Sequence, residues 1–165
     1  MGSGKSAVGR RLAQRLGYRF EDMDARIEAR AGRTIAEIFA EQGEAAFRGL
    51  EEAEARALRE ETRVVVAAGG GAFAEPRTRA LLQEGAMTVW LQCSLAAILR
   101  RVKPDGSRPL AGNRDIMRAL LAEREPSYRQ ADVAVDTSRR TPREVVDRIV
   151  GLASGPEQGK SSPRP

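Results

Sequence analysis

Apolar residues recur at helical spacing along much of the chain, and this pattern predicts a succession of amphipathic helices. The first helix shows it clearly, because Val8, Leu12 and Leu16 share one face, arginines occupy other positions and Gly17 ends the pattern. The predicted helices cover residues 5–16, 25–31, 35–42, 44–61, 76–84, 95–102, 114–125 and 142 onwards.

Short apolar runs between these helices predict β-strands. The run Val64-Val65-Val66 has no polar alternation, which indicates a strand that is covered on both faces, as in a parallel sheet. The predicted strands cover residues 18–20, 63–68, 88–93 and 133–136. Strands that alternate with helices predict an α/β fold with a doubly wound sheet.

The chain is predicted to form a single domain followed by a short tail. Residues 1–153 have one mixed composition and enough length to bury a hydrophobic core. Residues 103–113 carry Pro, Gly and Asp and are expected to form a loop. From residue 154 the composition changes to Gly, Pro, Ser, Gln and Lys, so we expect residues 154–165 to be a disordered tail.

The residues that are missing from the composition exclude several kinds of chemistry. The sequence contains no histidine, which excludes a Ser-His-Asp triad and a histidine-ligated zinc site. Cys93 is the single cysteine, which excludes an internal disulfide bond. Acid–base chemistry would therefore fall to carboxylates, lysine, tyrosine or cysteine.

The charge pattern favours small anions as partners. The net charge is +5, and the basic residues are mostly arginines interspersed with acidic residues. Aromatic residues make up only 4% of the chain, too few for a platform that stacks single-stranded nucleic acid. No apolar run has the length of a membrane helix, and no secretory signal is visible. We therefore expect no nucleic-acid partner, no membrane association and a cytoplasmic location.

The segment Gly2-Ser3-Gly4-Lys5-Ser6 matches the second half of a phosphate-binding loop of the Walker A type. Glycines let backbone N–H groups point at phosphates, and the following helix directs its positive end at the same anion. Lys5 would reach the β- and γ-phosphates of ATP, and Ser6 would ligate Mg²⁺. The alternative is a Gly/Ser-rich start before an ordinary helix.

The order of several motifs resembles the shikimate kinases, a family of small P-loop proteins related to nucleoside monophosphate kinases. The resemblance runs from Met1 to about Ala153. Its motifs are GSGKS, Asp22-x-Asp24, Gly43-Glu44 leading to Phe47-Arg48, Gly69-Gly70-Gly71, Arg108-Pro109-Leu110, Arg124-x-Pro126-x-Tyr128 and Asp136-Thr137 with Arg139-Arg140. The resemblance implies a three-layer α/β/α fold and an ATP-dependent kinase that phosphorylates the 3-hydroxyl of shikimate.

The resemblance also implies a role for each matching residue. Asp24 would orient the attacking hydroxyl and accept its proton, and Arg48 and Arg124 would clamp the substrate carboxylate. The glycines that would pack against the substrate ring are Gly69, Gly70 and Gly71. Taken alone, Asp22 and Asp24 also fit a helix N-cap with a solvated acidic turn.

The same comparison implies an ATP site and a metal site. The ATP-binding residues would be Gly2, Ser3, Gly4, Lys5, Ser6, Ala7, Arg108 and Arg140. Lys5 and Arg108 would act with Asp24 in catalysis, with Arg108 in a lid over the phosphates. Arg140 would lie against adenine, and Arg139 is a nearly equal alternative for this role. The Mg²⁺ cofactor would be held by Ser6 and Asp22.

The sequence departs from the family pattern at its start and at two further positions. Ala7 replaces a common threonine, and Met23 stands where a small hydroxylated residue is frequent. The first strand of the family's sheet, which lies centrally, and the first glycine of the loop are not in the sequence. We expect two unpaired strand edges and a slot in the core.

These observations leave alternatives to a monomeric shikimate kinase that binds ATP and shikimate. One is a related kinase for another hydroxylated acid, such as gluconate, since paired arginines suit any carboxylate. Another is an inactive, truncated P-loop protein. A third interpretation is that the true start lies upstream and supplies the strand.

Overall fold

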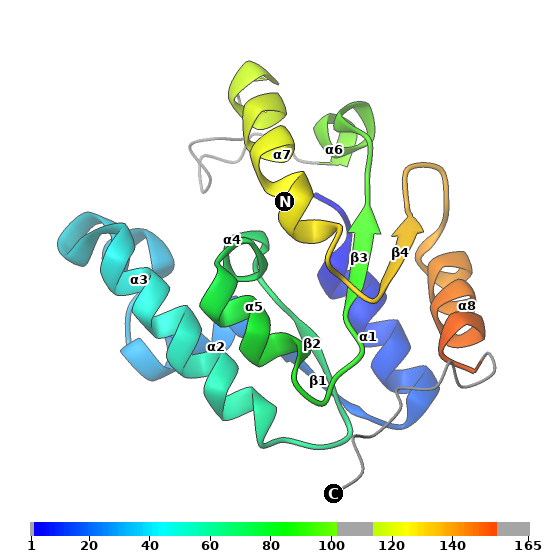
Figure 1. The fold of residues 1–165 in the computed structure, drawn as a ribbon, viewed down its shortest axis with the longest axis horizontal. Helices are drawn as coiled ribbons and strands as arrows, with labels where there is room; N and C mark the ends of the chain where they lie inside the picture. The colour runs from blue at the N-terminus through cyan, green and yellow to red at the C-terminus, as the bar shows by residue number, and fades with distance from the viewer. Residues whose placement is uncertain (1, 102–113, 155–165) are drawn as a thin grey trace, which may run out of the picture.

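The computed structural model describes residues 2–101 and 114–154 of the chain. Figure 1 shows helices on both sides of short strands in this part of the protein. Within the described ranges, every helix falls short of the length and apolarity that a membrane span requires. The predicted α/β architecture with parallel strands is confirmed.

The N-terminal elements begin and end where local sequence signals place them. Gly17 adopts a left-handed conformation with φ 66° and ends the first helix, and Thr34 and Glu37 form a complete capping box. The elements are α1 (Lys5–Leu16), β1 (Arg19–Asp22), α2 (Met23–Ala31), α3 (Ile35–Arg59) and β2 (Val64–Ala67). Gly43 breaks α3 with φ 79° and ψ 178°, so α3 consists of two helical segments, as predicted.

The C-terminal elements follow the same alternation. Thr141 and Glu144 form a second capping box, with Pro142 at the first helical position. The elements are α4 (Gly70–Ala74), α5 (Pro76–Gln83), β3 (Val89–Gln92), α6 (Leu95–Arg101), α7 (Arg114–Tyr128), β4 (Val133–Asp136) and α8 (Pro142–Ala153). The predicted loop at 103–113 lies outside the described residues, as does the tail beyond Ser154.

One local prediction was wrong. Helix α7 does not stop before Pro126 but continues through it to Tyr128. Pro126 has no backbone N–H to donate, but helical hydrogen bonding resumes after it, because the N–H of Arg129 donates to the carbonyl of Glu125 at 3.0 Å. After β2, Gly70 and Gly71 begin the short helix α4, which was not predicted from the sequence.

The described strands form two separate parallel pairs rather than one sheet. Strand β1 pairs with β2, with Arg19 opposite Val64, and β3 pairs with β4, with Val89 opposite Val133. Each pair has its own hydrophobic cluster. One is built around Met23, Ile27, Ile38, Phe47, Ala55, Leu58 and Ala72, and the other around Val8, Val135, Val145, Val146 and Ile149.

A cavity of about 990 Å³ separates the two pairs. Its walls include all of β2 and all of β3, and Val8 and Leu12 of α1 also line it. The residues of β3 are only half-buried, although they are apolar enough for a sheet interior. This cavity is the slot that the sequence predicts between two unpaired strand edges.

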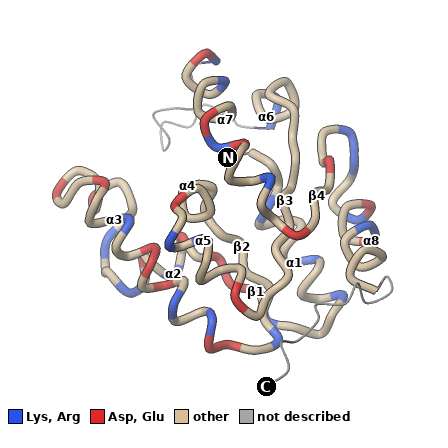
Figure 2. Tube along the Cα trace, viewed as in Figure 1, with Lys and Arg blue, Asp and Glu red and all other residues tan. Residues whose placement is uncertain are grey.

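Charged residues are interleaved along the chain. Figure 2 shows acidic and basic residues alternating along α2 and α3 rather than gathering in separate blocks. Several of them pair: Arg26 and Arg30 both contact Glu54, whose side chain is 1% exposed. The arginines of this region therefore hold helices together as well as charging the surface.

Candidate active site

The phosphate-binding loop leads directly into α1. Gly2 and Gly4 have φ values of 69° and 91°, which favour glycine, and Gly4 is the N-cap of α1. No side chain caps this helix, so its first N–H groups are free of a side-chain acceptor. A Cβ placed on Gly4 would meet nothing within 4 Å. The helix start is thus open to an anion.

Lys5 lies opposite two carboxylates from the end of β1 and the start of α2. Its Nζ is 4.0 Å from Asp22 Oδ2 and 3.7 Å from Asp24 Oδ2. Asp22 is also the N-cap of α2, since its Oδ1 accepts the backbone N–H of Asp24 at 3.2 Å. The N-cap interpretation and the site interpretation of this acidic turn are therefore both compatible with the structure.

Ser6 and Asp22 form an oxygen pair that suits a magnesium ion. The hydroxyl of Ser6 donates to Asp22 Oδ2 at 2.8 Å. Mg²⁺ prefers oxygen ligands, and in phosphate-transferring sites it uses one or two protein oxygens with phosphates and water. Within the described residues, no group of three His, Cys, Asp or Glu side chains could hold a metal by itself. The donor set fits an ion that arrives with phosphates.

The three glycines after β2 lie where a side chain would crowd polar or charged side chains of other elements. A Cβ on Gly69 would be 3.2 Å from both Asp24 Oδ1 and Glu51 Oε1. A Cβ on Gly71 would fall into the guanidinium of Arg48, with Cζ and Nη2 at 3.0 Å. The structure thus brings Asp24 and Arg48 together at this glycine segment.

Arg48 is held in place by two glutamates of its own helix. Its Nη1 donates to Glu51 at 2.5 Å and its Nη2 donates to Glu44 at 2.7 Å. Glu51 is 2% exposed, and burial raises the pKa of its carboxyl while Arg48 lowers it. Burial also lowers the pKa of Arg48, but the bonds to Glu51 and Glu44 outweigh it and raise the pKa. Arg48 therefore remains a cation.

Arg124 reaches the same glycines from α7, together with Tyr128. The hydroxyl of Tyr128 donates to the carbonyl of Gly70 at 3.2 Å, and a Cβ on Gly70 would be 3.7 Å from Arg124 Nη1. Burial raises the pKa of Tyr128, and the charge and hydrogen bond of Arg124 oppose this shift. The Tyr128 ring lies 5.9 Å from that of Trp90. Tyr128 therefore packs against Trp90 and also holds the glycine segment through a hydrogen bond.

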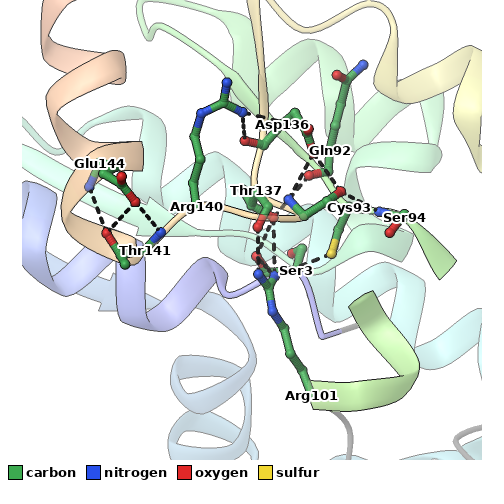
Figure 3. Close-up of polar contacts among 11 residues, drawn as sticks. Ser3, Gln92, Cys93, Ser94, Arg101, Asp136, Thr137, Arg140, Thr141 and Glu144 are labelled. Atoms are coloured by element: carbon green, nitrogen blue, oxygen red, sulfur yellow. Dashed lines mark hydrogen bonds and ion pairs between the residues drawn. The ribbon is translucent and has the colours of Figure 1, made fainter. Parts of the chain in front are cut away.

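The two arginines considered for the adenine contact both follow β4. Arg140 is exposed after β4, where its Nη1 donates to the carbonyl of Asp136 at 2.6 Å (Figure 3). Arg139 is exposed beside it. Arg108 lies outside the described residues.

Some residues at the site were missed by sequence reasoning. Glu51 is three positions after Arg48 on one helix, and this i,i+3 spacing could have identified the pair. Tyr128 and Thr137 lie in motifs, but the contacts of their hydroxyls gave no signal, because the partners are distant in the sequence.

The sequence matches a family of known proteins over nearly its whole length. The family model for shikimate kinase matches residues 1–153. A shikimate kinase of Geobacter sulfurreducens is 47% identical over 152 residues, covering 90% of this chain and 84% of the relative. One of Mycobacterium avium is 49% identical over 153 residues, covering 90% and 86%.

Solved structures agree with the sequence matches. Shikimate kinase from Acinetobacter baumannii, in complex with shikimate, superposes with a TM-score of 0.88 at 35% identity and covers 93% of this chain and 88% of that one. The enzyme of Aquifex aeolicus has a TM-score of 0.82 at 35% identity, with 94% and 95% covered. With this agreement in sequence and fold, the chain belongs to the shikimate kinase family.

Proposed function

We propose that this protein transfers the γ-phosphoryl group of ATP to the 3-hydroxyl of shikimate. The observation that carries the proposal is the convergence of Lys5 on Asp22 and Asp24, at 4.0 and 3.7 Å, beside a glycine segment flanked by Arg48. One site thus contains a lysine that can bind phosphates, an aspartate that can bind the substrate hydroxyl and an arginine that can bind the substrate carboxylate. The family match and a relative that binds shikimate support the same substrate.

The ATP side of the site uses the loop and the start of α1. The backbone N–H groups of Gly2–Ala7 would bind the phosphates, and Lys5 would neutralise charge on the β- and γ-phosphates. Ser6 and Asp22 would hold Mg²⁺, which when bound neutralises negative charge on the phosphate oxygens. Arg108 would cover the phosphates, and Arg140 would lie against adenine.

The shikimate side of the site positions the acceptor. Arg48 and Arg124 would bind the carboxylate, while Gly69, Gly70 and Gly71 leave room for the ring. Asp24 would accept the proton of the 3-hydroxyl while the oxygen of that hydroxyl bonds to the γ-phosphorus. The bond between the γ-phosphorus and the leaving ADP oxygen breaks at the same time. Phosphoryl transfer requires little covalent help from the protein, so position and charge account for most of the catalysis.

A coupled assay of ADP release tests the proposal. We expect turnover that depends on shikimate, with one shikimate 3-phosphate formed per ADP, and much slower turnover with gluconate. Gluconate as the better acceptor would favour a related kinase. Nucleotide binding without turnover by a folded chain would favour an inactive P-loop protein.

We further propose that the enzyme acts as a monomer in the cytoplasm, without nucleic-acid or membrane partners. The interleaved charges of α2 and α3 support this, because a nucleic-acid surface needs basic residues gathered on one face. Light scattering of the purified chain, with and without ATP, tests the monomer.

Glu51→Gln is expected to raise the KM for shikimate about tenfold, with little change in the KM for ATP. The substitution keeps the shape of the buried side chain but removes a charged hydrogen bond to Arg48, of the kind that contributes about 1.5–3 kcal/mol. Glu44→Gln is the matched control, because Glu44 bonds the same guanidinium from a side chain that is 66% exposed. Steady-state kinetics in which both variants behave alike would contradict this role for Glu51.

Gly71→Ala is expected to raise the KM for shikimate about tenfold or more, by displacing the guanidinium of Arg48. Alanine suits the helical backbone of α4, so the midpoint of thermal unfolding should stay unchanged. Gly49→Ala is the control, since a Cβ there meets nothing within 4 Å. Equal KM values for the two variants would show that the space at Gly71 is not needed.

A further inference from the structure

Thr137 is a buried residue that joins segments from three parts of the chain. It directly follows β4 and is 2% exposed. Its backbone N–H donates to the carbonyl of Gln92, at the end of β3, at 2.8 Å. Its hydroxyl lies 3.0 Å from that carbonyl and 3.3 Å from the carbonyl of Ser3 in the phosphate-binding loop. A hydroxyl has a single proton, and the Gln92 carbonyl already accepts the backbone N–H of Thr137, so this proton is shared between the end of β3 and the loop.

Arg101, the last residue of α6, completes this cluster. Its Nη2 donates to the carbonyl of Thr137 at 2.6 Å, and its Nη1 lies 3.3 Å from the Thr137 hydroxyl and 3.5 Å from the Ser3 carbonyl. A guanidinium only donates, whereas a hydroxyl both accepts and donates. Arg101 therefore donates to the hydroxyl oxygen of Thr137, and the proton of this hydroxyl remains available to a carbonyl. Figure 3 shows Arg101, Thr137 and Ser3 meeting beside Cys93.

The direction of the Ser3 carbonyl controls the loop. A trans peptide is planar, so the carbonyl of Ser3 and the N–H of Gly4 point to opposite sides of it. Gly4 follows this peptide and adopts a left-handed φ of 91°, which glycine reaches easily, so its backbone gives the peptide little intrinsic preference. A contact that fixes the carbonyl on one side also fixes the N–H on the other.

We infer that Thr137 is a positioning residue for the phosphate-binding loop. Its hydroxyl, supported by Arg101, holds the Ser3 carbonyl so that the N–H of Gly4 faces the bound nucleotide phosphates. This inference rests on the proposed use of ATP, but it does not depend on the identity of the acceptor.

The test is ADP binding to the full chain without shikimate, measured by isothermal titration calorimetry. Thr137→Val keeps the shape and the backbone bond to Gln92 but removes the hydroxyl. We expect it to weaken ADP binding about five- to tenfold, as the loss of one hydrogen bond allows. Thr137→Ser retains the hydroxyl and should bind within about twofold of the wild type.

Ser138→Ala is the matched control. The Ser138 hydroxyl accepts the N–H of Ser94 at 3.0 Å and donates to Asp136 at 2.6 Å, so it also joins the ends of β3 and β4. No contact with the loop is part of this bridge, and ADP binding should stay within about twofold. Equal weakening in Ser138→Ala and Thr137→Val would overturn the inference, since general loosening would then explain both.

Kinetics provide a second measurement. Thr137→Val should raise the KM for ATP by the same factor as the dissociation constant for ADP, with the KM for shikimate at saturating ATP unchanged. An unchanged ADP affinity, or no ADP binding by the wild type, would overturn the inference. If Thr137→Val does not fold, Thr137→Ala is judged by the same criteria, and failure of both to fold would assign the hydroxyl a structural role instead. Normal ADP binding without shikimate turnover would instead count against the proposed function alone.

Discussion

Asp24→Asn is expected to lower kcat for shikimate phosphorylation by about 10²- to 10⁴-fold, the range for loss of a positioned general base. The sequence has no histidine, and Asp24 is the carboxylate nearest to Lys5, at 3.7 Å. Asparagine keeps the size of the side chain and the backbone N–H that Asp22 accepts, so the start of α2 should persist. The KM for ATP should change little. Initial rates at saturating ATP and shikimate measure the effect.

Two controls separate this effect from a general loss of acidic charge. Asp147→Asn removes an exposed carboxylate of α8 and should leave kcat within about twofold. Asp22→Asn should instead raise the Mg²⁺ concentration needed for half-maximal rate, because Asp22 bonds to Ser6. If Asp24→Asn retained a third of the wild-type kcat, Asp24 would not be the proton acceptor.

Local sequence signals predicted most of the elements, because the residues that start and stop them act over one turn. Gly17 and the Thr34–Glu37 capping box are where the sequence places them, since each depends on backbone geometry nearby. The effect of Pro126 was misjudged. Proline lacks an N–H and crowds the turn before it, but it does not forbid a helix, and α7 continues for two residues beyond it.

The site could be predicted only as far as motifs identify residues one at a time. Lys5, Asp22 and Asp24 were found this way, and the structure brings them together. Motifs do not say which distant residues touch: Thr137 and Ser3 are 134 positions apart, and Tyr128 and Gly70 are 58 apart. Such contacts exist only once the strand ends and α7 are assembled, so sequence patterns could not reveal them.

The cavity between β2 and β3 determines how stable the described fold can be. It measures about 990 Å³, and its walls present strand edges whose backbone groups lack a strand partner on the cavity side within the described residues. Apolar side chains that face the cavity make fewer packing contacts, and exposed strand edges favour association with other chains. A parallel strand placed between the two pairs would supply both kinds of contact at once.

Extending the chain at its N-terminus with an apolar strand is therefore expected to raise the midpoint of thermal unfolding by about 5–10 °C. For a protein of this size, each kcal/mol of added stability raises the midpoint by about 2–4 °C. The extension would carry about five Val, Ile or Leu residues, with Gly two positions before Met1 to complete the Walker A spacing. Each buried apolar side chain contributes about 1.5–3 kcal/mol, against about 1–2 kcal/mol to order each residue, and the sheet hydrogen bonds add to the balance. A Gly/Ser extension of equal length is the control, measured by calorimetry and by binding of a dye that reports exposed apolar surface. A higher midpoint and weaker dye binding for the apolar extension alone would identify the cavity as an acceptor for a strand. Equal midpoints for the two extensions would contradict this and would mean that β2 and β3 close the cavity between themselves in solution.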